Sequence, residues 1–389
     1  MTPQVHAQAT EPHFVDHLAP VWQALPPETR GQFHVGSRAS RTRAAHHGIT
    51  PAKGRMPKTL DGIALAAAVG DLRRIVKITK VMPVVFFEHG CGLTYSTRRS
   101  SYAGAKNRPN VVQFVFPNEW SAGPQRAAHP HIPVDVIGST PKLDRWCDIE
   151  RNDISANVTP TVAVSFHWDC EIVPETRSAL GHYRKALAPL KAALAGEARI
   201  VGHSHPRIVS RASAAFREAG IEFWADFDRV LAEADLYAVD NSSTLYEFAS
   251  TDRPVVALNC PLYRRHVDHG LRFWEHIPGL ECDSPDQLPD VIREALLDPP
   301  GAQERRRNAI REVYPLHDGR SAERAAELVL AALEEHGEGI KIGGRRRPRR
   351  EWHFGDGPEP VVFLSWGEAS RFAVEHPDRP MQMLTNDRY

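Results

Sequence analysis

The sequence predicts an α/β protein built from doubly wound parallel sheets. Seven short runs rich in Val, Ile and Phe are almost continuously apolar, which is typical of strands covered by helices on both faces. They alternate with segments whose apolar residues recur at helical spacing, and strand–helix alternation of this kind favours parallel sheets. The predicted strands are 84–90, 111–118, 134–139, 161–169, 198–206, 236–243 and 254–260.

The helices are predicted between and after these strands. Segment 178–196 has apolar residues three and four positions apart and ends in a glycine, as helices often do. Segments 227–235 and 321–337 show the same spacing. We found no internal repeat at a solenoid period.

Composition narrows the class of protein. The chain has 389 residues, 48 Lys+Arg against 48 Asp+Glu and 42% hydrophobic residues, which fits a soluble protein of two domains and argues against a general polyanion binder. Its five cysteines are scattered without a CxxC pair, which excludes a disulfide scaffold and fits a reducing compartment. We see no signal peptide, and the longest apolar stretch, 63–70, is too short to span a bilayer. We therefore expect a cytoplasmic location and no transmembrane segment.

We expect three regions along the chain. Residues 1–155 form a first Rossmann-like domain and residues 156–338 a second, divided by a polar, weakly patterned stretch. Residues 339–389 read as a basic linker and a C-terminal tail, because Gly and Pro surround five arginines between Arg345 and Arg350.

Polar residues collect where the predicted strands end. Ligands bind outside the carboxyl ends of strands in open parallel sheets, so this placement indicates an active site. The polar groups are Glu88-His89-Gly90, Gly138-Ser139-Thr140, His167-Trp168-Asp169, His203-Ser204-His205 and Asp240-Asn241-Ser242-Ser243.

The most informative motif is the turn that follows the strand at 236–243. The strand delivers Asp240, and the hydroxyls of Ser242, Ser243 and Thr244 then meet the start of a predicted helix. Free N–H groups and the positive end of a helix suit a phosphate or diphosphate. The alternative is a capping box, since Thr244 precedes Glu247 by three residues.

Two other motifs centre on histidine. His89 ends a strand and is followed by Gly90, so its imidazole suits general base catalysis or, alternatively, caps the sheet. His203 and His205 lie two residues apart at the end of one predicted strand, and we do not expect them to share a metal. One of these two could neutralise a ligand phosphate.

Common nucleotide motifs are missing from the sequence. It contains no GxxxxGK[ST], no GxGxxG after the first strand and no GxSxG elbow. Asp169 and Glu171 lack a DxD partner, so a metal-dependent sugar-nucleotide site has little support.

In order, these pieces resemble the CDP-glycerol glycerophosphotransferase family, teichoic-acid polymerases of GT-B fold, and more loosely the UDP-N-acetylglucosamine 2-epimerase-like proteins. The resemblance is strongest over 198–330. The matching elements are His89-Gly90, GSTPKLD (138–144), His205-Pro206, Asp240-Asn241-Ser242-Ser243 with Glu247-Phe248, Arg253-Pro254 and Asp318-Gly319-Arg320-Ser321.

The resemblance implies a GT-B transferase with two Rossmann-like domains facing a central cleft. The second domain would hold a nucleotide-diphospho donor at Ser242 and Ser243, assisted by His205, and His89 would deprotonate the acceptor hydroxyl. No cofactor or essential metal is implied. Further donor-site candidates are Gly90, Ser139, His203, Asp240, Thr244 and Glu247.

Other functions remain open on the sequence alone. The acceptor could be a glycan, a polyol phosphate or a modified nucleobase. An epimerase of the same fold would use carboxylates, for which Glu88, Asp169 and Glu171 are the candidates. A nucleic-acid-modifying enzyme, or peripheral contact with a membrane, would use Arg345–Arg350 or the basic stretch 37–43, although both could be solvated segments.

Overall fold

The structure is a computed structural model of the 389-residue chain. It describes residues 3–53, 56, 61–79, 81–90, 108, 110–147, 159–169, 177–263 and 276–338, and the backbone of three later strands. The chain divides into two compact units. The first comprises Met1–His89, Tyr102–Asp144 and Tyr314–Tyr389, and the second comprises Gly90–Ser101 and Arg145–Val313.

The first unit contains a parallel sheet with strand order β2-β1-β3-β4-β5-β6. After β1 the chain forms β2 on one side of it and then crosses to form β3 on the other side. The carboxyl ends of β1 and β3 are therefore a topological switch point. The strands are β1 (Gln4–Ala9), β2 (Arg30–Val35), β3 (Gly62–Ala66), β4 (Val84–Phe87), β5 (Val111–Phe116) and β6 (Val134–Val136).

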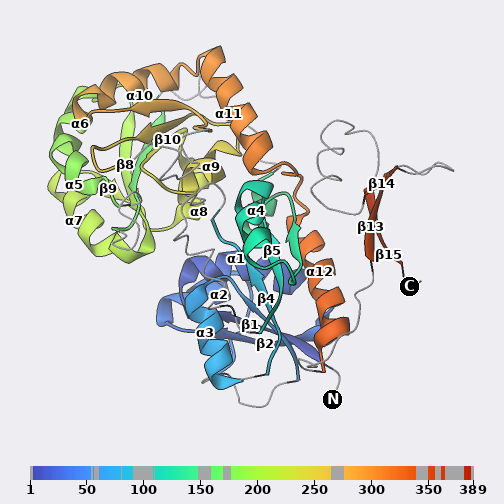
Figure 1. Ribbon diagram of the computed structural model, residues 1–389. Helices are drawn as coiled ribbons and strands as arrows, with labels where there is room; N and C mark the ends of the chain where they lie inside the picture. Colours follow the sequence, from blue (N-terminus) through green and yellow to red (C-terminus); the bar gives the residue numbers. More distant parts are fainter. Residues whose placement is uncertain are drawn as a thin grey trace. The chain divides into compact units, whose positions relative to one another are not determined.

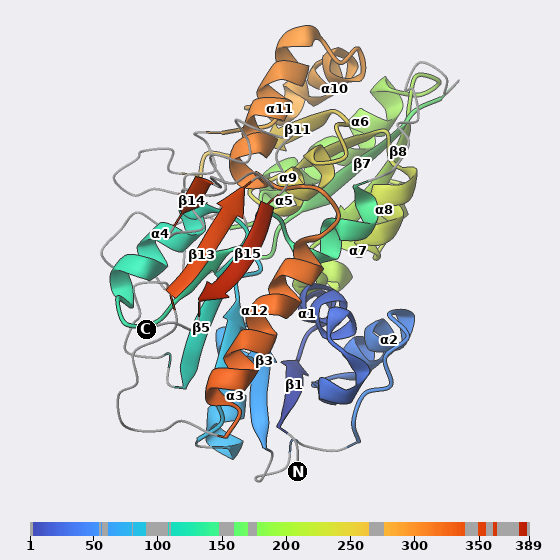
Figure 2. The same cartoon turned by 90° about the vertical axis from the view of Figure 1, so that its right-hand side faces the viewer.

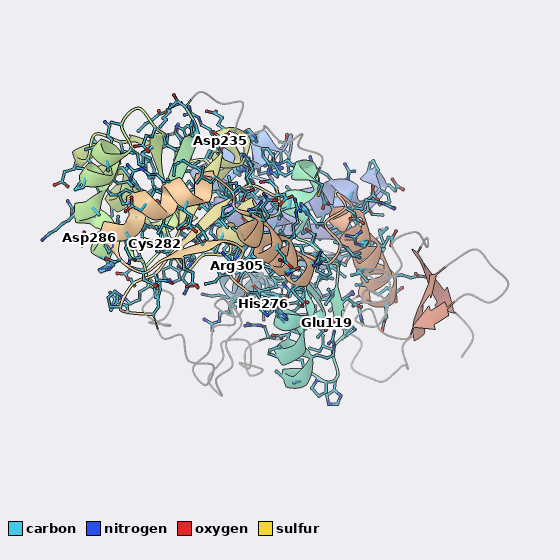
Figure 3. The ribbon with its side chains drawn as sticks, turned by 90° about the horizontal axis from the view of Figure 1, so that it is seen from above. Glu119, Asp235, His276, Cys282, Asp286 and Arg305 are labelled. Carbon is cyan, nitrogen blue, oxygen red and sulfur yellow. The ribbon has the colours of Figure 1, made fainter. Side chains whose placement is uncertain are left out.

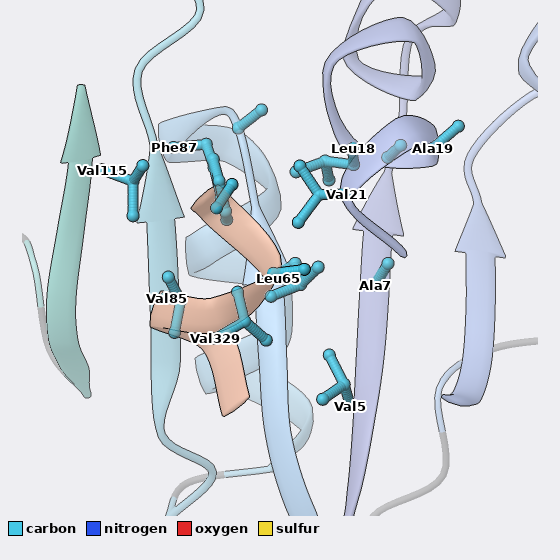
Figure 4. Close-up of a cluster of buried hydrophobic side chains, with 14 of the residues drawn as sticks. Val5, Ala7, Leu18, Ala19, Val21, Leu65, Val85, Phe87, Val115 and Val329 are labelled. Carbon is cyan, nitrogen blue, oxygen red and sulfur yellow. The ribbon is translucent and has the colours of Figure 1, made fainter. Parts of the chain in front are cut away.

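Helices cover both faces of this sheet. One face packs against α1 (Pro12–Ala24) and α12 (Ser321–His336), and Figure 4 shows Val329 among Leu65, Val85 and Phe87. The other face packs against α3 (Val69–Ile78) and α4 (Glu119–Ala128). Alternate strand residues therefore enter two separate cores, and full burial of each large side chain contributes about 1.5–3 kcal/mol. The unit also includes α2 (Arg38–His46), η1 (Pro27–Thr29) and the start of η3 (Pro141–Trp146).

Helix α12 differs from the domain division that the sequence suggested. The sequence placed 321–337 in the second domain, but α12 buries an alanine- and leucine-rich face on the sheet of the first unit (Figure 2). The chain therefore returns to the first unit after completing the second. A helix that packs on a distant sheet carries no sequence signal of its partner, because its spacing records only that one face is buried.

The second unit has a parallel sheet of order β12-β11-β10-β7-β8-β9, so β8 and β9 lie on one side of β7, and β10 and the later strands lie on the other. Strands β8, β9 and β10 of this sheet are labelled in Figure 1. Asp235, labelled in Figure 3, accepts a hydrogen bond of 2.7 Å from the N–H of Thr161 and so ties the start of β7 to the end of α8. The strands are β7 (Thr161–Phe166), β8 (Arg199–Ser204), β9 (Glu222–Phe223), β10 (Leu236–Val239), β11 (Val255–Leu258) and β12 (Leu280–Cys282).

The helices of the second unit follow its strands. The segment predicted as one helix over 178–196 is split by a 3-10 turn that begins at Arg184. The helices are α5 (Leu180–Tyr183), η6 (Arg184–Ala186), α6 (Leu187–Ala193), η7 (Pro206–Ile208), α7 (Val209–Glu218), α8 (Phe227–Glu233), α9 (Thr244–Ala249), η10 (Pro285–Gln287), α10 (Leu288–Leu296) and α11 (Pro300–Val313).

The end of the chain forms a small antiparallel sheet of order β14-β13-β15. Its strands are β13 (Arg349–Phe354), β14 (Val361–Phe363) and β15 (Met381–Asn386). The first part of the arginine cluster, 345–348, lies outside the described residues, so the expected nucleic-acid or membrane contact stays a prediction.

The fold class predicted from the sequence is confirmed, because the chain forms two parallel six-stranded sheets with helices on them. All seven predicted strands are present, each shorter at its C-terminal end than predicted. Within the described residues, no helix combines the length and the apolar character needed to cross a membrane.

Candidate active site

In the first unit, β4 delivers a carboxylate and an imidazole to the carboxyl edge of the sheet. The N–H of Glu88 bonds to the carbonyl of Val115 at 2.9 Å, so strand pairing continues one residue beyond β4. The side chain of Glu88 is 3% exposed, and its Oε1 accepts the N–H of His89 at 2.9 Å. That same oxygen lies 3.5 Å from Nδ1 of His89, while the His89 side chain is 40% exposed. The geometry therefore presents an accessible imidazole with a carboxylate behind it.

Helix α1 surrounds His89 with aromatic rings. The Phe14 ring meets the His89 ring edge-on at 5.0 Å, and the rings of His13 and His17 lie 6.2 and 6.1 Å from it between centroids. His13 and His17 are four residues apart, so they share one face of the helix. The predicted strand-end histidine thus belongs to a cluster of imidazoles.

A small pocket beside this cluster is lined by residues from the ends of β4, β5 and β6 and by His17 of α1. Nδ1 of the buried His17 lies 2.9 Å from Oγ1 of Thr140, and Oγ of the fully buried Ser139 lies 3.3 Å from Nδ1 of His317. Burial, together with the charge of Lys142, holds the pKa of His17 well below its usual value, and burial lowers the pKa of His317 to about 4. Both rings are neutral near pH 7. The pocket is lined in part by His17, Phe87, Glu88, Ser139, Thr140 and Pro141.

Ser139, a candidate donor-site residue, therefore sits in the first unit with its hydroxyl 3.3 Å from Nδ1 of the half-buried His317. Gly90 follows His89 directly and is half-buried.

Two of the motif segments, 138–144 and 318–321, contact each other at the start of α12. Asp144 accepts hydrogen bonds from the N–H and the hydroxyl of Ser321, at 3.1 and 2.6 Å, and from the N–H of Ala322 at 2.6 Å. Gly138 has φ +80°, and a Cβ there would lie 2.4 Å from Cβ of Leu316. These two segments therefore have a structural role within the first unit. We call the hydrogen bonds of Asp144 to Ser321 and Ala322 the latch.

In the second unit, Asp240 joins the two strands at the switch point. It is fully buried, and it accepts the N–H groups of His167 at 2.6 Å and Ala179 at 2.8 Å. Burial raises its pKa to about 7. Asp240 was predicted to bind the donor, but its carboxylate is directed to the protein backbone, where it fixes the loop after β7 beside the turn after β10.

The turn after β10 presents hydroxyls at the start of α9. Oγ of Ser242 lies 2.8 Å from Oγ1 of Thr244 and accepts the Thr244 N–H at 3.3 Å, and Ser243 and Thr244 are half-buried. The N-cap is Ser243, whose side chain makes no capping hydrogen bond. The alternative reading, a Thr244–Glu247 capping box, does not apply, because Ser243 is the N-cap and Thr244 is already the first helical residue. Helix α9 has only 6 residues, so hydroxyls and backbone N–H groups outweigh the helix dipole here.

A buried polar network supports this turn from below. Nδ1 of His203 lies 2.8 Å from Oγ of Ser165 and 3.5 Å from the hydroxyl of Tyr237, which in turn lies 3.0 Å from Oγ1 of Thr244. Burial raises the pKa of Tyr237, so its hydroxyl stays protonated. His203 is 4% exposed and Glu247 is 2% exposed. His203 therefore supports the turn through Tyr237, and both side chains are closed to solvent.

His205 makes contacts that are separate from that network. Its Nδ1 accepts the N–H of Arg207 at 3.1 Å, and its ring meets that of His167 edge-on at 5.3 Å. The guanidinium of Arg207 lies 4.6 Å above the ring of Trp168. His205 therefore belongs to a half-exposed aromatic and cationic group at the ends of β7 and β8.

Arg253, from the Arg-Pro motif segment, is structural. Its guanidinium is buried and bonds to the carbonyls of Leu231 and Ala234, the latter at 2.5 Å, and it stacks 4.4 Å from the Phe248 ring. It closes the C-terminal end of α8 onto α9.

Two of the three carboxylates proposed for an epimerase pair with other side chains or backbone groups of the protein. Asp169 forms a two-pronged ion pair with Arg177, at 2.8 and 3.1 Å, and the hydrogen bond from Arg177 lowers the pKa of Asp169. Glu88 is occupied by His89, and Glu171 lies outside the described residues. In the described part of the chain, no three His, Cys, Asp or Glu side chains gather in a way that could hold a metal ion.

Sequence reasoning missed His13, His17 and His317. The first two follow β1, which was not predicted as a strand, and the third precedes α12, which was assigned to the other domain. The signal that could have found the first pair is two histidines at i and i+4 directly after a short alternating run.

Part of the chain matches a known protein family. Residues 177–331 match the model of the family described as CDP-Glycerol:Poly(glycerophosphate) glycerophosphotransferase, so the resemblance stated from the motifs is confirmed for that part of the chain. No curated protein matches the chain by sequence.

Solved structures share the fold over most of the chain. A putative UDP-N-acetylglucosamine 2-epimerase from Listeria monocytogenes is 14% identical, with a TM-score of 0.55 over 89% of this chain and 100% of that chain. The S. aureus MnaA–UDP co-structure is 13% identical, with a TM-score of 0.58 over 88% and 100%. A variant of the wall teichoic acid polymerase TagF is 13% identical, with a TM-score of 0.57 over 86% and 90%. At these identities the likeness establishes the GT-B type of fold alone.

Proposed function

We propose that the chain is a transferase that moves a glycerophosphoryl or glycosyl unit from a nucleotide-diphospho donor to an acceptor hydroxyl. The family match over 177–331 supports this class of donor, and a TagF variant with the same fold was solved after soaking with CDPG. The observation that carries the proposal is the accessible His89 imidazole, with the Glu88 carboxylate 3.5 Å from its Nδ1.

In the proposed reaction His89 is the general base. The acceptor oxygen forms a bond to the transferred phosphorus or anomeric carbon, its proton passes to the imidazole, and the bond to the leaving nucleotide breaks. Buried Glu88 beside Nδ1 stabilises the imidazolium that forms, because opposite charges attract strongly where water is excluded. A positioned base of this kind accelerates transfer by about 10²–10⁴-fold.

The second unit would bind the donor phosphates. Ser243 and Thr244 supply half-buried hydroxyls and N–H groups, and Ser242 orients Thr244 through its hydroxyl. Asp240 and His203 act from beneath, by fixing the loop after β7 and the network under the turn. This arrangement supplies hydrogen-bond donors to a leaving phosphate without a metal ion.

A thermal-shift panel tests the donor class. CDP-glycerol, UDP-N-acetylglucosamine and the corresponding GDP and TDP compounds are added without Mg²⁺. We expect one of them to stabilise the protein, because a ligand that binds only the native state raises its stability. No shift with any member of the panel contradicts the proposal.

A double variant locates the donor site. Changing Ser242 and Ser243 together to alanine removes the hydroxyls of the turn, so the shift with the active nucleotide should fall. The matched control changes Ser210 and Ser213, two serines of α7 in the same unit, and should keep the full shift. Equal responses of the two double variants would place the donor elsewhere.

A further inference from the structure

A second carboxylate–imidazole pair lies beside the first. Nδ1 of His13 is 3.7 Å from Oε2 of Glu11, and Nδ1 of His89 is 3.5 Å from Oε1 of Glu88. Nδ1 is buried in both rings, whereas the His13 side chain as a whole is 20% exposed and that of His89 is 40% exposed. Solvent therefore reaches each ring from the side opposite its carboxylate.

The two rings are held next to each other. Their centroids are 6.2 Å apart with an angle of 51° between the planes. The Phe14 ring lies 4.0 Å from His13 and 5.0 Å from His89, so one rigid side chain fixes both. Hydrogen bonds of about 2.8 Å from each ring span a separation of this size when they meet on one oxygen or on two adjacent oxygens.

His17 does not join this pair as a third working group. It is buried and neutral, and its Nδ1 is engaged with Thr140 at 2.9 Å. The imidazoles of this cluster that solvent reaches are therefore those of His13 and His89.

We propose that His13, oriented by Glu11, is a second substrate-binding residue of the acceptor site and selects a vicinal diol. His89 takes the proton of the attacking hydroxyl, and His13 holds the neighbouring hydroxyl by a hydrogen bond without changing any covalent bond. Two adjacent imidazoles match two oxygens on adjacent carbons. The proposal deepens the proposed function, on which it rests, by naming the acceptor class as a polyol or sugar with neighbouring hydroxyls.

The first test uses ring ¹H–¹⁵N spectra of the full chain titrated with glycerol, a vicinal diol, and with propane-1,3-diol as the control. We expect glycerol to shift the resonances of both His13 and His89, and propane-1,3-diol to shift them several-fold less at equal concentration. Equal shifts with the two alcohols, or shifts of His89 alone, would overturn the proposal. Larger shifts with inorganic phosphate than with glycerol would also count against it and favour an anionic acceptor.

A variant separates binding from a structural role. His13→Gln should weaken glycerol binding several-fold and reduce the shift of the His89 resonances at equal glycerol concentration, because the amide does not hold the neighbouring hydroxyl in the same place. The other charged or titratable groups near the pair are Glu11, Glu88, His17 and Lys142, and they are unchanged.

The matched control is His336→Gln. His336 lies 3.6 Å from Glu335 and is 21% exposed, but it ends α12 outside the cluster. It should leave glycerol binding and the glycerol-induced shift of the His89 resonances unchanged. If His13→Gln behaves like this control, the proposal fails. No donor is present in these measurements, so a failure of donor binding in the thermal-shift panel is a separate result.

Discussion

The hydrogen bonds between Asp144 and the start of α12 test whether these two motif segments have a structural role. Asp144→Ala removes three hydrogen bonds at the N-terminus of α12, two from Ser321 and one from Ala322. A hydrogen bond to a charged group contributes about 1.5–3 kcal/mol, and helix-cap replacements cost about 1 kcal/mol. Because water replaces part of the loss at this half-buried carboxylate, we expect a cost of about 2–4 kcal/mol.

The control is Asp226→Ala. Asp226 caps α8 with one hydrogen bond to the N–H of Asp228 at 3.1 Å, so its loss should cost about 1 kcal/mol. Urea unfolding followed by circular dichroism at pH 7 compares the two variants. Asp144→Asn retains an acceptor oxygen and should fall between wild type and Asp144→Ala. An Asp144→Ala cost no larger than that of Asp226→Ala would refute the structural role of Asp144.

Three further outcomes follow from the described contacts. Arg306 is 1% exposed and paired with two aspartates, so Arg306→Met should cost about 3–5 kcal/mol in urea unfolding, whereas its neighbour Arg307, 50% exposed, should cost less than about 1 kcal/mol. Gly138→Ala forces a side chain into a φ of +80° and should destabilise, while Gly123→Ala, inside α4 with open space around it, should stabilise by about 0.5–1 kcal/mol; thermal melts that ranked them the other way would contradict this. Burial raises the pKa of Asp240 to about 7, so the folded state binds a proton that the unfolded state releases near pH 4. The contribution of protonated Asp240 to the free energy of unfolding is full below pH 4 and is lost as the pH rises to about 7. Unfolding midpoints between pH 5 and pH 8 should therefore fall less in Asp240→Asn than in wild type. Parallel curves for the two proteins would refute the raised pKa of Asp240.

The strands that the sequence revealed are those with continuous apolar character. β4, β5, β7 and β10 read clearly because both faces of each are buried. Strands β1, β2, β3, β9 and β12 were not predicted. In β1, His6 and Gln8 interrupt the apolar pattern, yet both are buried at 2% and 4% exposure. Nδ1 of His6 accepts the N–H of Gln32 at 2.9 Å, so a polar strand residue can be buried when the neighbouring strand supplies its partner.

The candidate site was predictable at the level of strand ends. His89 and the Ser242–Ser243 turn were found because polar residues follow buried strands, and the parallel topology brings such ends to one edge. The roles of Asp240 and His203 were not predictable from sequence. A carboxylate that binds substrate and one that binds two backbone N–H groups have the same local sequence, and only the folded chain shows which N–H groups lie within reach.

The claim on which the account depends most is that His89 acts as the base. Single-turnover transfer from the nucleotide selected in the thermal-shift panel to glycerol measures it directly, with wild type, His89→Gln and the control His336→Gln compared at pH 7.5. We predict that His89→Gln loses about 10²–10⁴-fold in transfer rate while its dissociation constant for the donor stays within about twofold. His336→Gln should match wild type in both. A transfer rate near wild type in His89→Gln would contradict the account.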